Sequence, residues 1–498
     1  MLTRLKASGF KNLVDVDVYL GPFTCIAGAN GVGKSNLFDA IVFLSALAEK
    51  PLLDAALSVR DEGGRTGDVR SLFHRVGSAP LEEMSFEVEM IVPAEALDDL
   101  GQPARATSTF LRYELVLAYR GEEGYRSVGG LELLKEQLTH INVGEAHAHL
   151  WFPHSYSRWR KSAVRGHRTA AFISTEGSGP DRKIKVHQDT GSAGKPRSYL
   201  ARTLPRTALS AGSNAAEGPT VTMARKEMQS WRLLQLEPSS LRRPDVFTAP
   251  TKLATDGGNL AATLYHLAHD GIVGGSSGGM PAGAAESQVY ARLANRLAEL
   301  IDDVSSVYVD RDDRRELLTL QVTDRDGTTH PARALSDGTL RFLALAVLEL
   351  DPRATGLLCL EEPENGIHPT RIPAMRDLLK AVTTNVFEPV GDDNPLRQAI
   401  VNTHSPAVVG EMDDQDLLVA ELRETIRPED ESRFKRLALS CLSETWRARA
   451  GTPTATRGRL LAYLNPVSPK AEEARGRRGP SSGRTLSGRR VADRKDLQ

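Results

Sequence analysis

A glycine-rich turn at residues 28–35, GANGVGKS, is the feature that most constrains the fold of this 498-residue chain. It matches G-x-x-x-x-G-K-[ST], in which glycines let the backbone fold so that successive N–H groups point at phosphate oxygens. An apolar strand is predicted before the turn, at residues 23–27, and apolar residues recur at helical spacing after it, from Leu37 to Ala48. A chance glycine turn is the ordinary alternative, but the flanking strand and helix argue against it.

The residue types in this turn predict binding of phosphate and of Mg²⁺. Lys34 would reach the outer phosphates, and the hydroxyl of Ser35 would bind the metal ion. The positive N-terminal end of the following helix points at the same place. The residues predicted to bind nucleotide here are Gly28, Asn30, Gly31, Gly33, Lys34, Ser35 and Asn36.

An acidic pair follows a second apolar run, at residues 356–360. A parallel strand of a doubly wound sheet presents the residues at its carboxyl end beside the phosphate loop. Glu361 would hold Mg²⁺, and Glu362 would polarise the attacking water. The first acid in such strands is usually Asp, so the longer Glu361 must reach the metal with one methylene more. The ordinary alternative is a solvated acidic turn after a core strand.

The segment LSDGT at residues 335–339 precedes a predicted helix at 337–350. Ser336 would cap this helix and Gly338 would allow close approach, so its N-terminus forms a second phosphate-binding end. Two chains packed head to tail would each supply this end to the nucleotide of the other. A well-capped helix is the ordinary alternative.

His404 lies just after a predicted strand at residues 399–403. Its imidazole would contact the γ-phosphate and sense its loss. A surface histidine in a turn is the ordinary alternative.

The patterning predicts an α/β fold with a mixed or parallel sheet flanked by helices and a β-rich, basic insertion between the glycine turn and Ser336. Antiparallel strands are expected at 84–93 and 110–119, a loop at 271–285, and helices near 286–301 and 370–383; the turn DRDG between LLTLQV and THPARAL predicts a hairpin. The predicted units are 1–120 and 236–445 as two parts of one nucleotide-binding domain, 121–235 as a partly loop-rich insertion, and 446–498 as a mostly disordered basic tail.

Composition narrows the function classes. The formal net charge is −1, so binding to nucleic acid would require a local patch. The 3 cysteines form no C-x-x-C pair, and no apolar run reaches the length of a signal peptide or a membrane helix. We therefore expect a cytoplasmic protein.

One local patch stands out at residues 151–168, WFPHSYSRWRKSAVRGHR. Its basic residues alternate with aromatic ones, a combination that pairs with phosphates and stacks on bases. A partly exposed loop with its aromatics packed beneath it, or a protein-binding surface, is the alternative. The candidate nucleic-acid contacts are Arg158, Arg160, Lys161, Arg165 and Arg168.

In their order along the chain, these motifs resemble those of the AAA-15/AAA-21 group of ATPases, relatives of the RecF, SMC and OLD-type ABC ATPases. The segments that carry the resemblance are FKNL (10–13), GANGVGKS (28–35), LATDGGNLAATL (253–264), LSDGT (335–339), LCLEEPENGIHP (358–369) and NTHSP (402–406). The resemblance implies ATP and Mg²⁺ as ligands, and it covers residues 120–235 poorly.

The resemblance also implies roles for single residues. Lys34 and Ser35 would bind phosphate and Mg²⁺, Glu361 and Glu362 would be the metal-binding and catalytic acids, Ser336 and Gly338 would act in trans, and His404 would be the switch. Lys11 and Asn12 would lie near the base or ribose. No glutamine can be assigned as a further metal ligand.

OLD-type relatives add a nuclease domain with clustered acids. In this chain an exposed acidic loop is the better interpretation of the acids after His404, which are Glu411, Asp413, Asp414 and Asp416. We therefore expect no nuclease activity in this chain alone.

The motifs favour an ATPase that works as a nucleotide-driven dimer switch, in a homodimer or a higher even oligomer. The resemblance implies a role in DNA repair or anti-phage defence with a separate effector nuclease, as in the Septu-type defence ATPases. The nucleotide-binding subunit of a membrane transporter is one alternative, and an ATP-binding scaffold with little turnover is another.

Overall fold

A computed structural model gives the structure of the chain. It describes residues 1–59, 68–77, 79–121, 130–189, 195–211, 218–269, 282–427, 431–458 and 460.

A seven-stranded sheet forms the centre of the molecule. Its order is β14 (Arg232–Leu234), β19 (Gly356–Glu361), β20 (Arg397–Thr403), β3 (Phe23–Ala27), β21 (Leu417–Ile426), β22 (Arg433–Leu442) and β23 (Thr454–Ala455). The strands from β14 to β21 are parallel, and β22 is antiparallel to β21. Every residue of β3 and β20 is buried, as expected for parallel strands covered on both faces.

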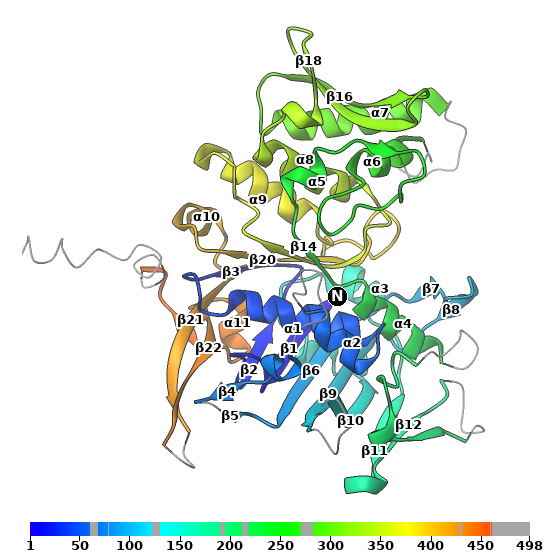
Figure 1. Ribbon diagram of the computed structural model, residues 1–498, viewed down its shortest axis with the longest axis vertical. Coiled ribbons are helices and arrows are strands. Elements are labelled where there is room, and N and C mark those ends of the chain that lie inside the picture. The colour runs from blue at the N-terminus through cyan, green and yellow to red at the C-terminus, as the bar shows by residue number, and fades with distance from the viewer. Residues whose placement is uncertain are drawn as a thin grey trace, which may run out of the picture.

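A second, antiparallel sheet of eight strands lies below β14, β20 and β3 in Figure 1, with β21 and β22 of the first sheet at its left. Its order is β13 (Arg197–Leu200), β12 (Lys183–Val186), β11 (Ile173–Glu176), β10 (Gly130–His140), β9 (Phe110–Arg120), β6 (Glu83–Ile91), β1 (Leu2–Ser8) and β2 (Val16–Tyr19). The antiparallel strands predicted at 84–93 and 110–119 are confirmed as β6 and β9. The strands of the predicted insertion extend this same sheet, because β10 pairs with β9.

Helix α1 (Lys34–Leu47) follows the glycine turn and packs between the two sheets. Its apolar residues share one core with Val88 and Leu115 of the antiparallel sheet and with Cys359 and Ile400 of the central sheet. Burial on both sides fixes the start of α1, and therefore the turn before it, relative to both sheets.

The opposite face of the central sheet is covered by helices, in the upper part of Figure 1. These are α6 (Leu260–His269), α7 (Ala282–Ala298), α8 (Asp337–Leu350) and α9 (Ile372–Ala381), with a small sheet of β15 (Asp245–Val246), β16 (Val304–Asp312), β17 (Leu317–Asp324) and β18 (Thr329–Pro331). The helices predicted at 286–301, 337–350 and 370–383 and the DRDG hairpin are confirmed.

The described chain has further α-helices and strands. They are α2 (Leu52–Leu57), α3 (Lys161–Ala163), α4 (Pro219–Gln229), α5 (Pro238–Leu241), α10 (Pro406–Glu411), α11 (Trp446–Arg449), β4 (Arg75–Val76), β5 (Ala79–Pro80), β7 (Glu95–Leu97) and β8 (Pro103–Arg105). Within the described ranges, no helix has the length and hydropathy needed to cross a bilayer.

The C-terminal prediction differs in part from the structure. The sequence predicts a mostly disordered tail over 446–498; its first part is folded as α11 and β23, because buried Trp446 and Arg447 anchor this segment to the core. Most of the predicted loop at 271–285 and the basic tail from 461 onward lie outside the described residues.

Candidate nucleotide site

The turn between β3 and α1 has the backbone of a phosphate cradle. Gly31 and Gly33 have φ of +78° and +106°, values that favour glycine. A Cβ on Gly28 would lie 2.4 Å from the carbonyl oxygen of Ala420, so only glycine fits there. The Nζ of Lys34 donates to the carbonyl oxygens of Gly28 (2.7 Å) and Ala29 (2.9 Å).

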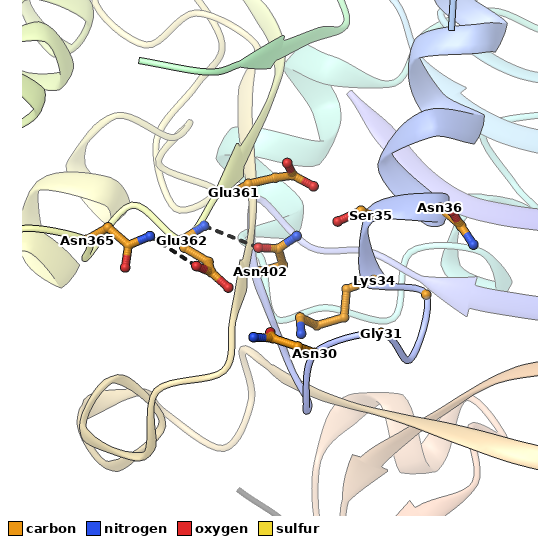
Figure 2. Close-up of a pocket in the computed structure, with 10 residues that line it drawn as sticks. Asn30, Gly31, Lys34, Ser35, Asn36, Glu361, Glu362, Asn365 and Asn402 are labelled. Carbon is orange, nitrogen blue, oxygen red and sulfur yellow. Dashed lines mark hydrogen bonds between the residues drawn. The ribbon is translucent and has the colours of Figure 1, made fainter. Parts of the chain in front are cut away.

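A cavity of about 500 Å³ opens beside this turn. It is lined by Asn30, Gly31, Gly33, Lys34, Ser35, Asn36, Glu361, Glu362, Asn365 and Asn402. The structure thus brings together most of the predicted residues of the turn and both predicted acids. In Figure 2 the Glu361 carboxylate points toward Ser35.

Strand pairing explains why these distant segments meet. In the register of the parallel strands, Glu361 of β19 pairs with Asn402 of β20, and Thr403 pairs with Ala27 at the end of β3. The carboxyl ends of all three strands therefore lie at one edge of the sheet, where ligands of open α/β sheets bind.

Glu362 is held from three sides. Its backbone N–H donates to Asn402 Oδ1 (3.2 Å), the Asn365 amide donates to its Oε2 (3.0 Å), and His404 Nδ1 lies 2.5 Å from its Oε1. Figure 2 shows the first two of these bonds. Glu362 has φ of +47°, a strained conformation for this residue type that persists only where neighbours enforce it.

Two opposing effects act on the pKa of Lys34 in the cavity. Burial lowers the pKa of this ammonium group, and the carboxylates of Glu362, Glu364 and Glu361 act in the opposite direction. Glu364 is buried and accepts a hydrogen bond from the Thr403 hydroxyl. Burial raises the pKa of Glu364.

Ser336 and Gly338 are not among the residues that line this cavity. Ser336 caps α8, since its Oγ accepts from the N–H of Thr339 (3.2 Å), and its side chain is exposed. A Cβ on Gly338 would lie 2.3 Å from the carbonyl oxygen of Gly366, so the start of α8 sits directly on the loop after β19.

Lys11 and Asn12 lie in the segment between β1 and β2 and contact the glycine turn and α1. The Asn12 amide donates to Val32 O (3.0 Å) and accepts from Asn36 (2.8 Å), and Lys11 Nζ pairs with buried Asp39 (2.6 Å).

Lys11, Asn12 and Asn36 also line a second cavity of about 540 Å³. The rest of its lining is Ser71, Phe73, His74, Arg75, Glu424, Arg433, Phe434 and Lys435. Because Asn36 lines both cavities, the second one lies next to the phosphate cradle.

Sequence reasoning missed three residues at the site. Asn365 and Asn402 hold Glu362, and Gln235 lines a small cavity of about 160 Å³ with Glu361 and Glu362. Gln235 follows β14, which pairs with β19 in parallel. An amide just after an apolar strand was the only signal for Gln235, and a three-residue strand is too short to stand out.

The basic segment at 151–168 has both buried and exposed residues. Phe152 and Trp159 are buried, whereas Trp151 and Tyr156 are exposed. Arg158 forms an ion pair with Glu388, and Arg168 donates to the carbonyl oxygens of Asp189 and Gln188. The guanidinium of Arg165 donates to Ser162 O. The guanidinium of Arg160 and the ammonium of Lys161 lie over the Tyr156 ring. Two of the four aromatic side chains are thus buried, as expected for the alternative of a partly exposed loop with aromatics packed beneath it.

The acids after His404 are engaged in ion pairs. Asp413 and Asp416 pair with Lys380, Asp414 with Arg457, and Glu411 with Arg376. In the described part of the chain, no group of three His, Cys, Asp or Glu side chains is placed to hold a metal ion.

The glycine cradle, the parallel sheet and the helical part that carries Ser336 define an ABC-type P-loop NTPase. The chain belongs to the AAA-21 family, described as "AAA domain, putative AbiEii toxin, Type IV TA system", whose model matches residues 23–114 and 227–410, more than half of the chain. The predicted family and fold class are therefore confirmed, and the chain is an ATPase of this type.

Comparison with solved structures found an Smc head bound to the C-winged helix domain of ScpA, with 13% identity and a TM-score of 0.42, covering 89% of this chain and 99% of that one. It also found the Smc head domain with an extended coiled coil bound to the C-terminal domain of ScpA from Pyrococcus furiosus, with 13% identity, a TM-score of 0.37, and coverage of 89% and 97%. No curated protein matches the chain.

Proposed function

We propose that this chain binds ATP with Mg²⁺ and hydrolyses it, and that two copies close head to tail around the nucleotide. The observation that carries the proposal is the cavity of about 500 Å³ in which Lys34 and Ser35 face Glu361 and Glu362. A cradle for phosphate and an oriented carboxylate in one cavity are the two parts that phosphoryl transfer to water requires.

The donor set fits Mg²⁺. The Ser35 hydroxyl and the Glu361 carboxylate offer the hard oxygen ligands that this ion prefers, and Gln235 adds an amide oxygen beside Glu361. When bound, the ion supplies positive charge that neutralises the phosphate oxygens. Lys34 would exchange the carbonyl oxygens of Gly28 and Ala29 for phosphate oxygens.

Glu362 would act as the base that orients the attacking water. Its two carboxylate oxygens are held by Asn365 and His404, which keep it aimed at one place. His404 would sense the γ-phosphate through this same contact, because its ring lies against the carboxylate that faces the cavity.

The exposed cap of α8 supports the dimer. The exposed Ser336 precedes the 14-residue helix α8 and the buried Gly338 lies in its first turn, yet neither lines the cavity of their own chain. A head-to-tail partner would bring them against the phosphates of the other copy.

The second cavity, beyond Asn36, is proposed to take the nucleoside. Asn12 and Lys11 would then act mainly by holding the cradle and flanking the ribose, because their polar atoms already bond to Val32, Asn36 and Asp39.

The biological role is proposed as a cytoplasmic switch in anti-phage defence or DNA repair that drives a separate effector protein. The family description, which names a toxin of a toxin–antitoxin system, supports the defence setting. Nucleic acid would be contacted through Arg160 and Lys161, whose charged groups lie over the exposed Tyr156 ring. Arg158, Arg165 and Arg168 would contribute less, because they already bond to Glu388 or to backbone carbonyl oxygens.

Phosphate release by the wild type, Glu362→Gln and Lys34→Ala tests the enzymatic part. We expect Glu362→Gln to lower turnover by roughly 10²-fold or more while ATP binding persists. Lys34→Ala should lose binding as well. Wild-type protein that releases no more phosphate than Lys34→Ala would refute hydrolysis.

A further inference from the structure

Arg341 connects helix α8 to two loops of the candidate nucleotide site. It lies five residues after the cap Ser336, on the same helix. Its Nε donates to the carbonyl oxygen of Leu236 (3.1 Å), and its Nη1 donates to that of Asn365 (2.9 Å). Within the described residues it forms no ion pair with a carboxylate, so both bonds of this half-buried guanidinium go to backbone.

Each of the two loops carries a polar residue of the site. The loop after β14 begins with Gln235, and the loop after β19 runs from Glu362 through Asn365. Arg341 lines the small cavity of about 160 Å³ together with Gln235, Glu361 and Glu362. One side chain on α8 therefore fixes the spacing between these loops.

The bond to Asn365 is the first of two hydrogen bonds that connect Arg341 to the carboxylate of Glu362. Arg341 holds the backbone of Asn365, and the Asn365 amide donates to Glu362 Oε2 (3.0 Å). Because Glu362 has a strained backbone with φ of +47°, its geometry depends on such tethers.

A second contact links the same helix to the same loop. Gly338 packs so closely on Gly366 that a Cβ would come within 2.3 Å of its carbonyl oxygen. A displacement of the N-terminus of α8 would therefore move the loop at 362–366, since closely packed backbone has no slack to absorb it.

We infer that Arg341 is a positioning residue that couples the exposed N-terminus of α8 to Glu362 of the same chain. This inference rests on the proposed hydrolysis. Engagement of Ser336 and Gly338 by a partner's nucleotide would set the position of Asn365, and through it the aim of the Glu362 carboxylate. Arg341 does not itself touch nucleotide.

The test measures kcat and KM for ATP in Arg341→Ala, Arg341→Gln, Asn365→Ala and the double variant Arg341→Ala/Asn365→Ala. The matched control is Arg333→Ala, an exposed arginine in the short helical turn just before Ser336. We expect each single variant to lower kcat by roughly 10- to 100-fold, the loss that misplacement by about 1 Å causes. KM should stay within about 2-fold, and the double variant should be no slower than the worse single one. Arg333→Ala should match the wild type.

Three results would overturn the inference. A normal kcat in Arg341→Gln, measured together with an active wild type, would contradict this inference and leave the proposed hydrolysis intact. A raised KM with unchanged kcat would make Arg341 a phosphate ligand instead, and additive losses in the double variant would place Arg341 and Asn365 on separate paths. Thermal unfolding identifies a misfolded Arg341→Ala protein, in which case Arg341→Gln carries the test. A wild type without turnover would overturn both this inference and the proposed function.

Discussion

The sheet edge at the nucleotide cavity and the basic segment at 151–168 look equally functional in sequence, but they differ in structure. At the edge, the conspicuous residues Lys34, Ser35, Glu361 and Glu362 line one cavity. In the basic segment, Trp159 is buried and Arg158 is paired with Glu388. The difference teaches that a motif with fixed spacing constrains backbone geometry, whereas a composition of basic and aromatic residues leaves their exposure open.

The largest expected effect lies at the sheet edge. Among the described residues that line the cavity, Lys34 is the only side-chain cation, so in Lys34→Ala ATP turnover should fall to background, by roughly 10³-fold or more. Lys50→Ala, just after α1, is the control and should leave turnover unchanged. Substantial ATP turnover in Lys34→Ala would show that the residues at the sheet edge are no more essential for activity than those of the basic segment.

Trp159→Ala should show that the basic segment contributes mainly to stability. Its side chain is fully buried against Phe152, so truncation should lower the free energy of unfolding by about 3–5 kcal/mol. Tyr156→Ala, at an exposed aromatic in the same turn, should cost less than about 0.5 kcal/mol. Chemical denaturation measures both, and equal effects would contradict the assignment of Trp159 to the core.

Glu136 in the antiparallel sheet should make stability depend on pH. Burial raises the pKa of this carboxyl to about 7, although it accepts bonds from the N–H groups of Ala208 (2.7 Å) and Leu209 (2.8 Å). The folded protein therefore holds a proton that the unfolded chain, with a pKa of about 4.5, releases. Between these pKa values, stability should fall as the pH rises.

Glu136→Gln should flatten this slope of the unfolding free energy, and Glu132→Gln on the same strand is the control. An unchanged slope in Glu136→Gln would show that Glu136 is ionised in the folded protein across this range.

The smallest effect is expected for Arg158→Ala. Its ion pair with Glu388 joins two exposed side chains, so its loss should change stability by less than about 1 kcal/mol. It should also leave the salt dependence of DNA affinity unchanged, whereas Arg160→Ala combined with Lys161→Ala should reduce it. A weaker salt dependence of DNA affinity in Arg158→Ala would show that Arg158 does contact nucleic acid.

Local pattern was enough to predict the central elements of the fold. The glycine turn, the helix at 337–350 and the apolar strands at 356–360 and 399–403 each carry their signal within a few residues. The size of the antiparallel sheet could not be predicted, because short strands such as β11 and β12 gain their stability by pairing with β10 and with each other.

The supporting residues of the site were beyond prediction for a related reason. Asn402 lies beside Glu361 only because β20 pairs with β19, and Gln235 lies there only because β14 does. Such contacts join segments that are far apart in sequence, so no local motif marks them. The Glu362–His404 contact is of the same kind.

The central claim is that two copies enclose nucleotide between the Lys34 turn of one and the Ser336 helix of the other. The mass of Glu362→Gln in solution, measured by light scattering, tests this claim most directly. We predict a dimer with ATP, a monomer with ADP, and a monomer with ATP when Ser336→Arg is added. A monomeric Glu362→Gln protein that holds bound ATP would contradict the account.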